Sequence, residues 1–285
     1  MKVTRNGPPA KLLILLSNDD GVNARGLAAL RRAVRGLGEI WVVAPDREKS
    51  ACSLSITLNQ PLRVHQIGPR IFSADGTPAD CIYLAVQKLL PRRPDILISG
   101  INSGPNLARQ DISYSGTVAA ALQGSFLDIP SMAVSLTHDG RGRYDYAYAG
   151  KVVRSLVQQI IRKPHDPKVT INVNIPPPPF KGIRVTVLGE KRYNPEIVEK
   201  EDPRGKLYYW ISTGPLSISG SEKTDVQAVK DGFISITPLY SDLTDYKYAL
   251  RPELKKLTAL LFLDGVNFRK ARAGRKLGLS RIRQR

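Results

Sequence analysis

The chain has 285 residues, of which 42% are apolar and 24% are charged, a composition typical of a globular protein. Its 43 basic and 25 acidic side chains give a net charge of +18. The longest uncharged apolar runs, such as residues 12–16, are far shorter than the roughly 18 residues of a membrane span, so no membrane association is expected. The chain has only two cysteines, Cys52 and Cys81, too few for a disulfide framework or a cysteine zinc site. We therefore expect a cytoplasmic protein.

Strand and helix patterns alternate through the first 180 residues. Residues 11–17 are an apolar run that ends in a polar turn, which predicts a buried parallel strand. Residues 24–37 then carry leucine and valine at helical spacing. Further strands are expected at 40–44, 96–99, 131–136 and 169–175, and further helices at 78–90, 116–127 and 145–162. This alternation predicts an α/β fold with a doubly wound, mostly parallel sheet.

The pattern changes after four consecutive prolines at 176–179, which exclude both helix and central strand. Beyond them the sequence predicts a hairpin-rich part, with strands at 183–188, 207–213 and 233–238 and a short helix at 225–230. We expect one domain over residues 1–264, with a core at about 11–180. The portion at about 181–264 is expected to serve oligomerisation, because its strands have few local means of burial.

A basic tail is expected at residues 265–285. This segment holds eight basic side chains and no acidic one. Such a run is typical of a solvated, partly disordered extension. It can also bind RNA or another polyanion weakly, because neutralised phosphates release counterions.

Three polar loops follow predicted strands. In an open parallel sheet, ligands bind beyond the carboxyl ends of the strands, where these loops would meet. Neither a dinucleotide-binding glycine motif nor a phosphate-binding P-loop is present, and the three histidines stand in no metal or triad motif. The loops are residues 18–21, 45–50 and 100–106.

Adjacent carboxylates in the first loop point to a cation. Asp19 and Asp20 would repel each other unless a positive charge lies between them. With the Ser50 hydroxyl and the Asn102 carbonyl they form an all-oxygen set that suits Mg²⁺ or Mn²⁺. An alternative stays open, in which Asn18 and Asp19 form an Asx turn and Asp20 caps the following helix.

A second candidate feature precedes the helix expected at 116–127. Ser115, Gly116 and Thr117 would offer backbone N–H groups, hydroxyls and a positive helix end to a phosphoryl group. Ordinary capping by Ser115 or Thr117 explains the same residues equally well.

Five segments, taken in order, resemble motifs of the SurE family of survival-protein 5′-nucleotidases, and the similarity extends over roughly residues 11–250. The resemblance implies a divalent-metal-dependent phosphatase of nucleoside 5′-monophosphates, with a Rossmann-like three-layer α/β/α core and a C-terminal part used in dimers or tetramers. Activity on 3′-nucleotides or short polyphosphate is a further expectation. The segments are SNDDGVNARG (17–26), VVAPDREKS (42–50), GTPADC (76–81), SGINSGPN (99–106) and YSGTVAAA (114–121).

The resemblance also implies roles for single residues. One Mg²⁺ or Mn²⁺ per subunit is expected, and Asp19 and Asp20 are the expected catalytic residues, as general base or as nucleophile. The implied metal ligands are Asp19, Asp20, Ser50 and Asn102. The implied phosphate and substrate contacts are Asn18, Asn106, Ser115, Gly116 and Thr117.

Two alternatives from other classes remain. A receiver-like regulatory domain also holds Mg²⁺ on an acidic pair after its first strand, but it needs a phospho-accepting Asp after a middle strand, where this chain has Ser99 and Asn102. In a non-enzymatic RNA-binding protein, the net charge itself would be the active property. Phosphate release from AMP separates the enzyme from both.

Overall fold

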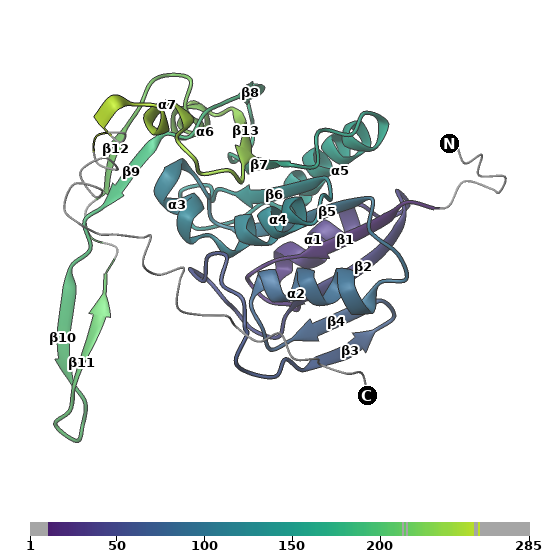
Figure 1. Ribbon diagram of the computed structural model, residues 1–285, viewed down its shortest axis with the longest axis horizontal. Coiled ribbons are helices and arrows are strands. Elements are labelled where there is room, and N and C mark those ends of the chain that lie inside the picture. Colours follow the sequence, from purple (N-terminus) through teal and green to yellow (C-terminus); the bar gives the residue numbers. More distant parts are fainter. Residues whose placement is uncertain (1–10, 213, 215, 254–255, 257–285) are drawn as a thin grey trace, which may run out of the picture. The chain divides into compact units, whose positions relative to one another are not determined.

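The computed structural model describes residues 11–212, 214, 216–253 and 256. The chain divides into two units after Ser241, and each is described by itself. Within the described residues, the first unit is built on a nine-stranded sheet with the spatial order β3-β4-β2-β1-β5-β6-β7-β13-β8 (Figure 1). Its strands are β1 (Leu13–Ser17), β2 (Glu39–Pro45), β3 (Val64–Gly68), β4 (Ile71–Ala74), β5 (Ile96–Ser103), β6 (Ser131–Leu136), β7 (Val169–Ile175), β8 (Ile183–Val185) and β13 (Ile234–Tyr240).

The six strands from β4 to β7 in this order are mutually parallel, and antiparallel pairing occurs at β3–β4 and β7–β13. Strand β1 lies between β2 and β5, so the chain moves outward to β2 and β4 and then returns to the other side of β1. This reversal makes a topological switch point between β1 and β5, whose residues Ser17 and Ser99 pair in register. Ligands of such sheets bind at the carboxyl ends of the strands beside this point.

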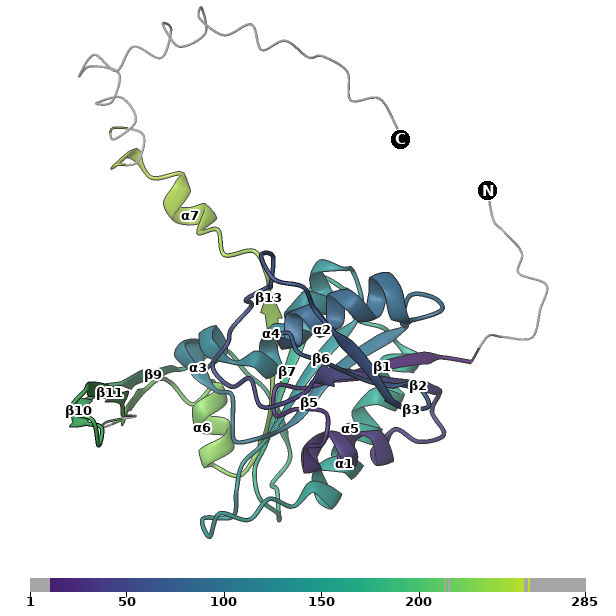
Figure 2. The same ribbon diagram turned by 90° about the horizontal axis from the view of Figure 1, so that it is seen from below.

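Helices cover both faces of the sheet (Figure 2). Ile14 and Leu16 of β1 point to the face that α1 (Arg25–Ala33) and α5 (Tyr146–Arg162) cover, whereas Leu15 points to the opposite face. That second face is covered by α2 (Pro78–Leu84), its π-helical continuation η1 (Ala85–Leu89) and α4 (Gly116–Phe126). Because both faces are buried, β1 is apolar at every position before Ser17. The expected three-layer α/β/α fold is confirmed.

Two local expectations were wrong in detail. The first helix ends at Ala33 rather than at residue 37, because the backbone leaves the helical conformation before Gly36, whose φ is +82°. The Arg154 guanidinium donates hydrogen bonds of 2.8 Å to the carbonyls of Ala33 and Arg35 at this end. The β3–β4 pair was not predicted. Its strands have mixed polar and apolar residues and pair antiparallel beside β2 at the sheet edge, where one face need not be apolar.

The C-terminal part of the first unit is rich in hairpins, as predicted. Strands β9 (Glu190–Tyr193) and β12 (Leu216–Ser219) pair antiparallel, and so do β10 (Ile197–Glu201) and β11 (Leu207–Ile211). Figure 1 shows the β10–β11 hairpin extending away from the nine-stranded sheet. Helix α6 (Asp225–Lys230) packs beside β13, and α3 (Ala108–Tyr114) lies against β9.

The second unit contains helix α7 (Tyr246–Ala249), whose N-cap Asp245 accepts a hydrogen bond from the Tyr248 amide at 2.8 Å. The predicted domain end at residue 264 and the basic tail lie outside the described residues. Among the described helices, none combines the length and the apolar character that crossing a membrane demands.

Candidate active site

A cavity of about 560 Å³ lies at the carboxyl ends of β1, β2 and β5. Six of the residues predicted from the sequence line it, although they come from four separate segments. Asn18, Gly116 and Thr117 are not among its lining residues. The lining residues are Asp19, Asp20, Glu48, Ser50, Ala51, Asn102, Ser103, Asn106, Asp111, Tyr114, Ser115 and Tyr193.

Backbone hydrogen bonds join the loops after β1 and β2. The Lys49 amide donates to the Asp19 carbonyl at 2.8 Å, and the Val22 amide donates to the Pro45 carbonyl at 2.8 Å. Gly21 lies between these contacts with a φ of +99°, and a Cβ there would be 3.1 Å from the Arg47 carbonyl carbon. Only glycine therefore fits this turn without strain, and the turn holds the two acidic residues beside the second loop.

Asp19 is held almost out of contact with water. Its exposed fraction is 5%, its Oδ1 accepts a hydrogen bond from the Thr117 hydroxyl, and its Cβ lies 2.7 Å from where a Cβ on Gly116 would be. Burial raises the pKa of Asp19 to about 6; the hydrogen bond from Thr117 opposes this shift, and the neighbouring Asp20 adds to it. The sequence at the start of α4 thus fixes the carboxylate that follows β1.

Asp20 carries the clearest sign of a missing partner. Its Oδ2 is buried, and no hydrogen-bond donor meets it within the described residues. Burial raises the pKa of Asp20, hydrogen bonds from Ser103 oppose the shift, and the charge of Glu48 adds to it. A buried carboxylate oxygen without a donor is costly unless a cation or a proton satisfies it.

Ser50 and Asn102 supply neutral oxygens to the same cavity. The Ser50 hydroxyl donates to Glu48 Oε1 at 2.7 Å, so its lone pairs remain as acceptors. The Asn102 amide nitrogen donates to the Gly104 carbonyl at 2.8 Å, which leaves the side-chain carbonyl as the group's other polar end. Although no three His, Cys, Asp or Glu side chains gather for a metal anywhere in the described chain, two carboxylates with two neutral oxygens fit a hard divalent cation.

The capping alternative for Asp20 is wrong. Helix α1 begins after Ala24, which acts as its N-cap without a side-chain hydrogen bond. No Asx turn is seen here either: the Asn18 amide nitrogen donates to the Gly21 carbonyl at 2.9 Å, whereas the Asn18 side-chain oxygen is buried and accepts no hydrogen bond within the described residues. Asn18 is fully buried and braces the loop through Gly21, and its predicted contact with substrate stays a prediction.

The start of α4 fits the second predicted feature. Ser115 is its N-cap and accepts a hydrogen bond from the Val118 amide at 3.1 Å, while Gly116 and Thr117 begin the helix. The Thr117 hydroxyl is directed at Asp19. Asn106 lines the cavity, and its amide nitrogen donates to the Ser135 hydroxyl at 2.8 Å. Capping and phosphate binding are compatible here, since the N-cap leaves other N–H groups at the helix start.

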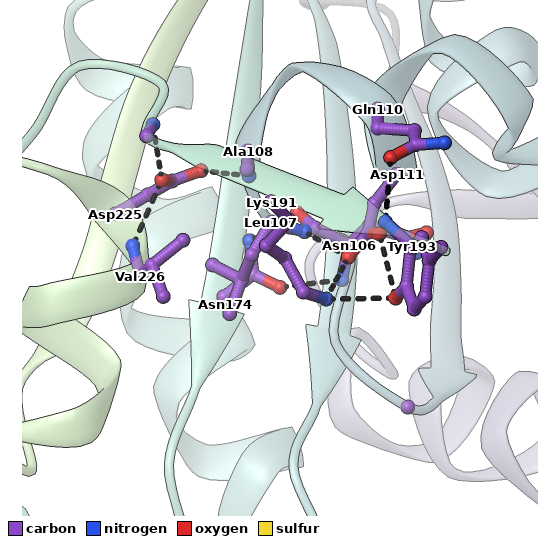
Figure 3. A network of polar contacts seen from close by, with 12 residues as sticks. Asn106, Leu107, Ala108, Gln110, Asp111, Asn174, Lys191, Tyr193, Asp225 and Val226 are labelled. Carbon is purple, nitrogen blue, oxygen red and sulfur yellow. Dashed lines mark hydrogen bonds and ion pairs between the residues drawn. The ribbon is translucent and has the colours of Figure 1, made fainter. Parts of the chain in front are cut away.

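Several residues in the cavity lining or beside it were not predicted. Asp111 lies on α3, and Lys191 and Tyr193 lie on β9, about 80 residues further along the chain, yet all three share hydrogen bonds (Figure 3). For these three residues, the one usable signal was the spacing of Lys191 and Tyr193, which places both on one face of a strand. Glu48 and Ser103 also line the cavity, and their position beside predicted ligands was the available signal.

The chain is similar to known proteins over most of its length. The family described as "Survival protein SurE" matches residues 14–195. A protein of Geobacter metallireducens named 5′-nucleotidase SurE is 47% identical over 236 residues, covering 82% of this chain and 93% of that protein. A protein of the same name from Pelotomaculum thermopropionicum is 46% identical over 254 residues, covering 86% and 94%.

A solved structure agrees with this similarity. The crystal structure of the SurE protein from Aquifex aeolicus superposes with a TM-score of 0.72 at 37% identity, covering 88% of this chain and 99% of that one. The fold and the similarity over more than four fifths of the sequence agree, and the chain belongs to the SurE family.

Proposed function

We propose that the chain hydrolyses nucleoside 5′-monophosphates to nucleoside and phosphate, with one Mg²⁺ or Mn²⁺ per subunit. The observation that carries the proposal is the joint presence of Asp19, Asp20, Ser50 and Asn102 in one cavity, with a carboxylate oxygen of Asp20 buried and unpaired within the described residues. The relatives named 5′-nucleotidase supply the substrate class. Activity on 3′-nucleotides and short polyphosphate belongs to the same proposal.

Different residues hold the cation and the phosphoryl group in this proposal. Asp19, oriented by Thr117, and Asp20 hold the cation together with the neutral oxygens. When bound, the cation supplies charge neutralisation and Lewis acidity for hydrolysis by water. N–H groups at the start of α4, near Ser115 and Gly116, hold the phosphoryl oxygens as charge shifts onto them.

The spacing of the acids bears on the route. Asp19 and Asp20 are adjacent in sequence rather than flanking one residue, so the pattern of phosphatases that form an aspartyl-phosphate is absent. We therefore propose direct attack by water.

Phosphate release from AMP tests the proposal. With Mn²⁺ or Mg²⁺ the purified chain should release phosphate, EDTA should abolish the release, and added Mn²⁺ should restore it. A receiver-like domain or an RNA-binding protein would show no turnover. Full activity in EDTA, or no release with either metal, would contradict the proposal.

We also propose that the active protein is a homodimer or a tetramer. The β10–β11 hairpin exposes large apolar side chains, among them Trp210 at 62% and Ile211 at 77%. A two-stranded hairpin alone is marginally stable in water, and an apolar face of this kind gains free energy when it is covered. A second copy of the chain is the proposed partner. The cytoplasm is the proposed compartment, since both cysteines are free thiols.

A further inference from the structure

A buried ion pair forms one wall of the same cavity. The Lys191 ammonium donates to Asp111 Oδ2 at 2.5 Å and to the Tyr193 hydroxyl at 3.0 Å, and that hydroxyl donates to Asp111 Oδ1 at 2.9 Å (Figure 3). The side chains of the ion pair are 9% and 8% exposed. Asp111 and Tyr193 line the cavity, whereas Lys191 is not among its lining residues.

The wall is held together across distant parts of the chain. The Tyr193 amide donates to Gln110 Oε1 at 3.1 Å, and the Arg109 amide donates to the Gly189 carbonyl at 3.2 Å, so β9 is fastened to α3 on both sides of the ion pair. The Ser53 hydroxyl donates to the Ser113 carbonyl at 2.7 Å. The loop that carries Ser50 is therefore attached to the same wall.

This arrangement holds the Asp111 carboxylate in one orientation. Three donors meet its carboxylate, because the Leu107 amide also donates to Oδ2 at 3.1 Å. Burial disfavours the charge of Lys191, but the hydrogen bonds to Asp111 and Tyr193 outweigh it and raise the pKa of the ammonium. Buried ion pairs often add little net stability compared with an apolar pair. What this one adds is a fixed carboxylate at a cavity wall.

The acceptor sites of Asp111 limit what the wall can bind. A carboxylate offers about four lone-pair sites, and three of those on Asp111 are taken. The remaining site is on Oδ1, the oxygen that accepts only from Tyr193 among the described residues. It suits a hydroxyl or amine donor and repels a phosphate. Of a phosphate monoester, only a neutral, donor-bearing part therefore suits this site.

We propose that Asp111, with Tyr114 beside it in the cavity lining, receives the sugar of the nucleoside and accepts a hydrogen bond from a ribose hydroxyl, and that Lys191 and Tyr193 are positioning residues for this carboxylate. This inference rests on the proposed function. Acidic side chains recognise ribose hydroxyls in the same way in dinucleotide-binding folds. A site built to hydrogen-bond a hydroxyl discriminates against an analogue that lacks it.

Three substrates test the inference on the unmodified protein and on its variants: AMP, 2′,3′-dideoxy-AMP and phenyl phosphate. For the parent, kcat/KM should be roughly 10- to 100-fold lower for dideoxy-AMP than for AMP, the scale of a hydrogen bond to a charged group. Asp111→Asn should lower kcat/KM for AMP toward the dideoxy value while phenyl phosphate hydrolysis changes little. Tyr193→Phe should act in the same direction but less strongly.

Asp128→Asn is the matched control, since it neutralises an exposed carboxylate at a positive φ of 51° that asparagine tolerates. It should leave all three rates unchanged. The inference is overturned if the parent hydrolyses AMP and dideoxy-AMP equally well, or if Asp111→Asn lowers AMP and phenyl phosphate hydrolysis by the same factor. If Asp111→Asn does not fold, the parent comparison and Tyr193→Phe together still test the inference, because Tyr193→Phe removes a donor to the same carboxylate. Failure of the proposed function is distinguishable, because the parent would then release no phosphate from AMP at all.

Discussion

Two regions of the molecule depart from ordinary burial in opposite directions. In the cavity, carboxylates are buried: Asp19 is 5% exposed, and an oxygen of Asp20 has no donor within the described residues. In the β10–β11 hairpin every strand residue is exposed, although β11 reads Leu-Tyr-Tyr-Trp-Ile. Buried charge and exposed apolar surface both cost free energy in an isolated chain. A cation would relieve the first cost and another polypeptide the second, so the proposed metal site and the proposed assembly surface lie in different regions and can be tested separately.

The largest effect should come from neutralising the buried acids. Asp19→Asn and Asp20→Asn keep the side-chain shape and remove the charge that holds the cation, so AMP turnover should fall by roughly 10³-fold or more, as when one member of a catalytic unit is removed. In EDTA, each variant should melt at or above the temperature of the parent, because repulsion between adjacent carboxylates is relieved. Phosphate release measures the expected loss of turnover, and thermal melting measures the expected stability. If both variants hydrolyse AMP at the parental rate, the buried carboxylates of the cavity do not hold a catalytic cation.

A smaller loss should follow from crowding Asp19 without changing its charge. A Cβ at Gly116 would lie 2.7 Å from the Asp19 Cβ, a distance that one or both must relieve by moving. Gly116→Ala should therefore lower kcat/KM for AMP by about 10²-fold, the scale of a 1 Å misplacement, and destabilise folding by about 1–3 kcal/mol through overpacking.

Gly68→Ala is the control for this substitution. Its Cβ would meet Ile71 at an ordinary 3.4 Å, so turnover and melting temperature should stay near the parental values. Equal effects of the two substitutions on turnover would show that the decrease does not depend on the position of Asp19.

Sequence patterns predicted the first half of the site because its residues follow strands directly. Strand β1 is a continuous apolar run, so its end at Ser17 and the loop with Asp19 and Asp20 could be placed without a structure. Asn102 belongs to β5 itself, which extends to Ser103, four residues past its predicted end. Here the apolar pattern ended earlier than the strand's hydrogen bonds.

The other half of the site, formed by Asp111, Lys191 and Tyr193, could not be predicted, because it depends on contacts between distant segments. Asp225, at the start of α6, accepts hydrogen bonds of 2.8 Å from the amides of Ala108 and Gly189 and so ties α3 and β9 together (Figure 3). No local sequence pattern predicts this role for Asp225, because an acidic residue in the first turn of a helix is common. The same holds for Lys191, which on its own reads as a surface lysine.

Substitutions in the exposed β10–β11 hairpin should weaken self-association more than they lower AMP turnover. Light scattering at micromolar concentration should give the mass of a dimer or larger for the parent. Trp210→Ser should weaken association by roughly 30-fold or more, because buried tryptophans are frequent interface hot spots. Lys200→Ser, an exposed polar change on the paired strand, should leave the mass unchanged. A monomeric parent would contradict the proposal that a second copy of the chain covers the hairpin.

The smallest effect on turnover should come from the basic tail. Residues 265–285 contribute +8 of the net +18 charge. Deleting them should change kcat for AMP by less than about twofold at 0.15 M salt, where the Debye length of about 8 Å screens exposed charges.

The same deletion should weaken binding to single-stranded RNA. The slope of log K against log salt concentration should become shallower by about 0.7 for each phosphate that the tail neutralises. Replacing the eight basic residues by glutamine at full length should reproduce both results, because charge and not length is the cause. A fall in melting temperature of several degrees on deletion would instead show that the tail packs against the folded chain, and its charge would then contribute to the electrostatics of the folded protein.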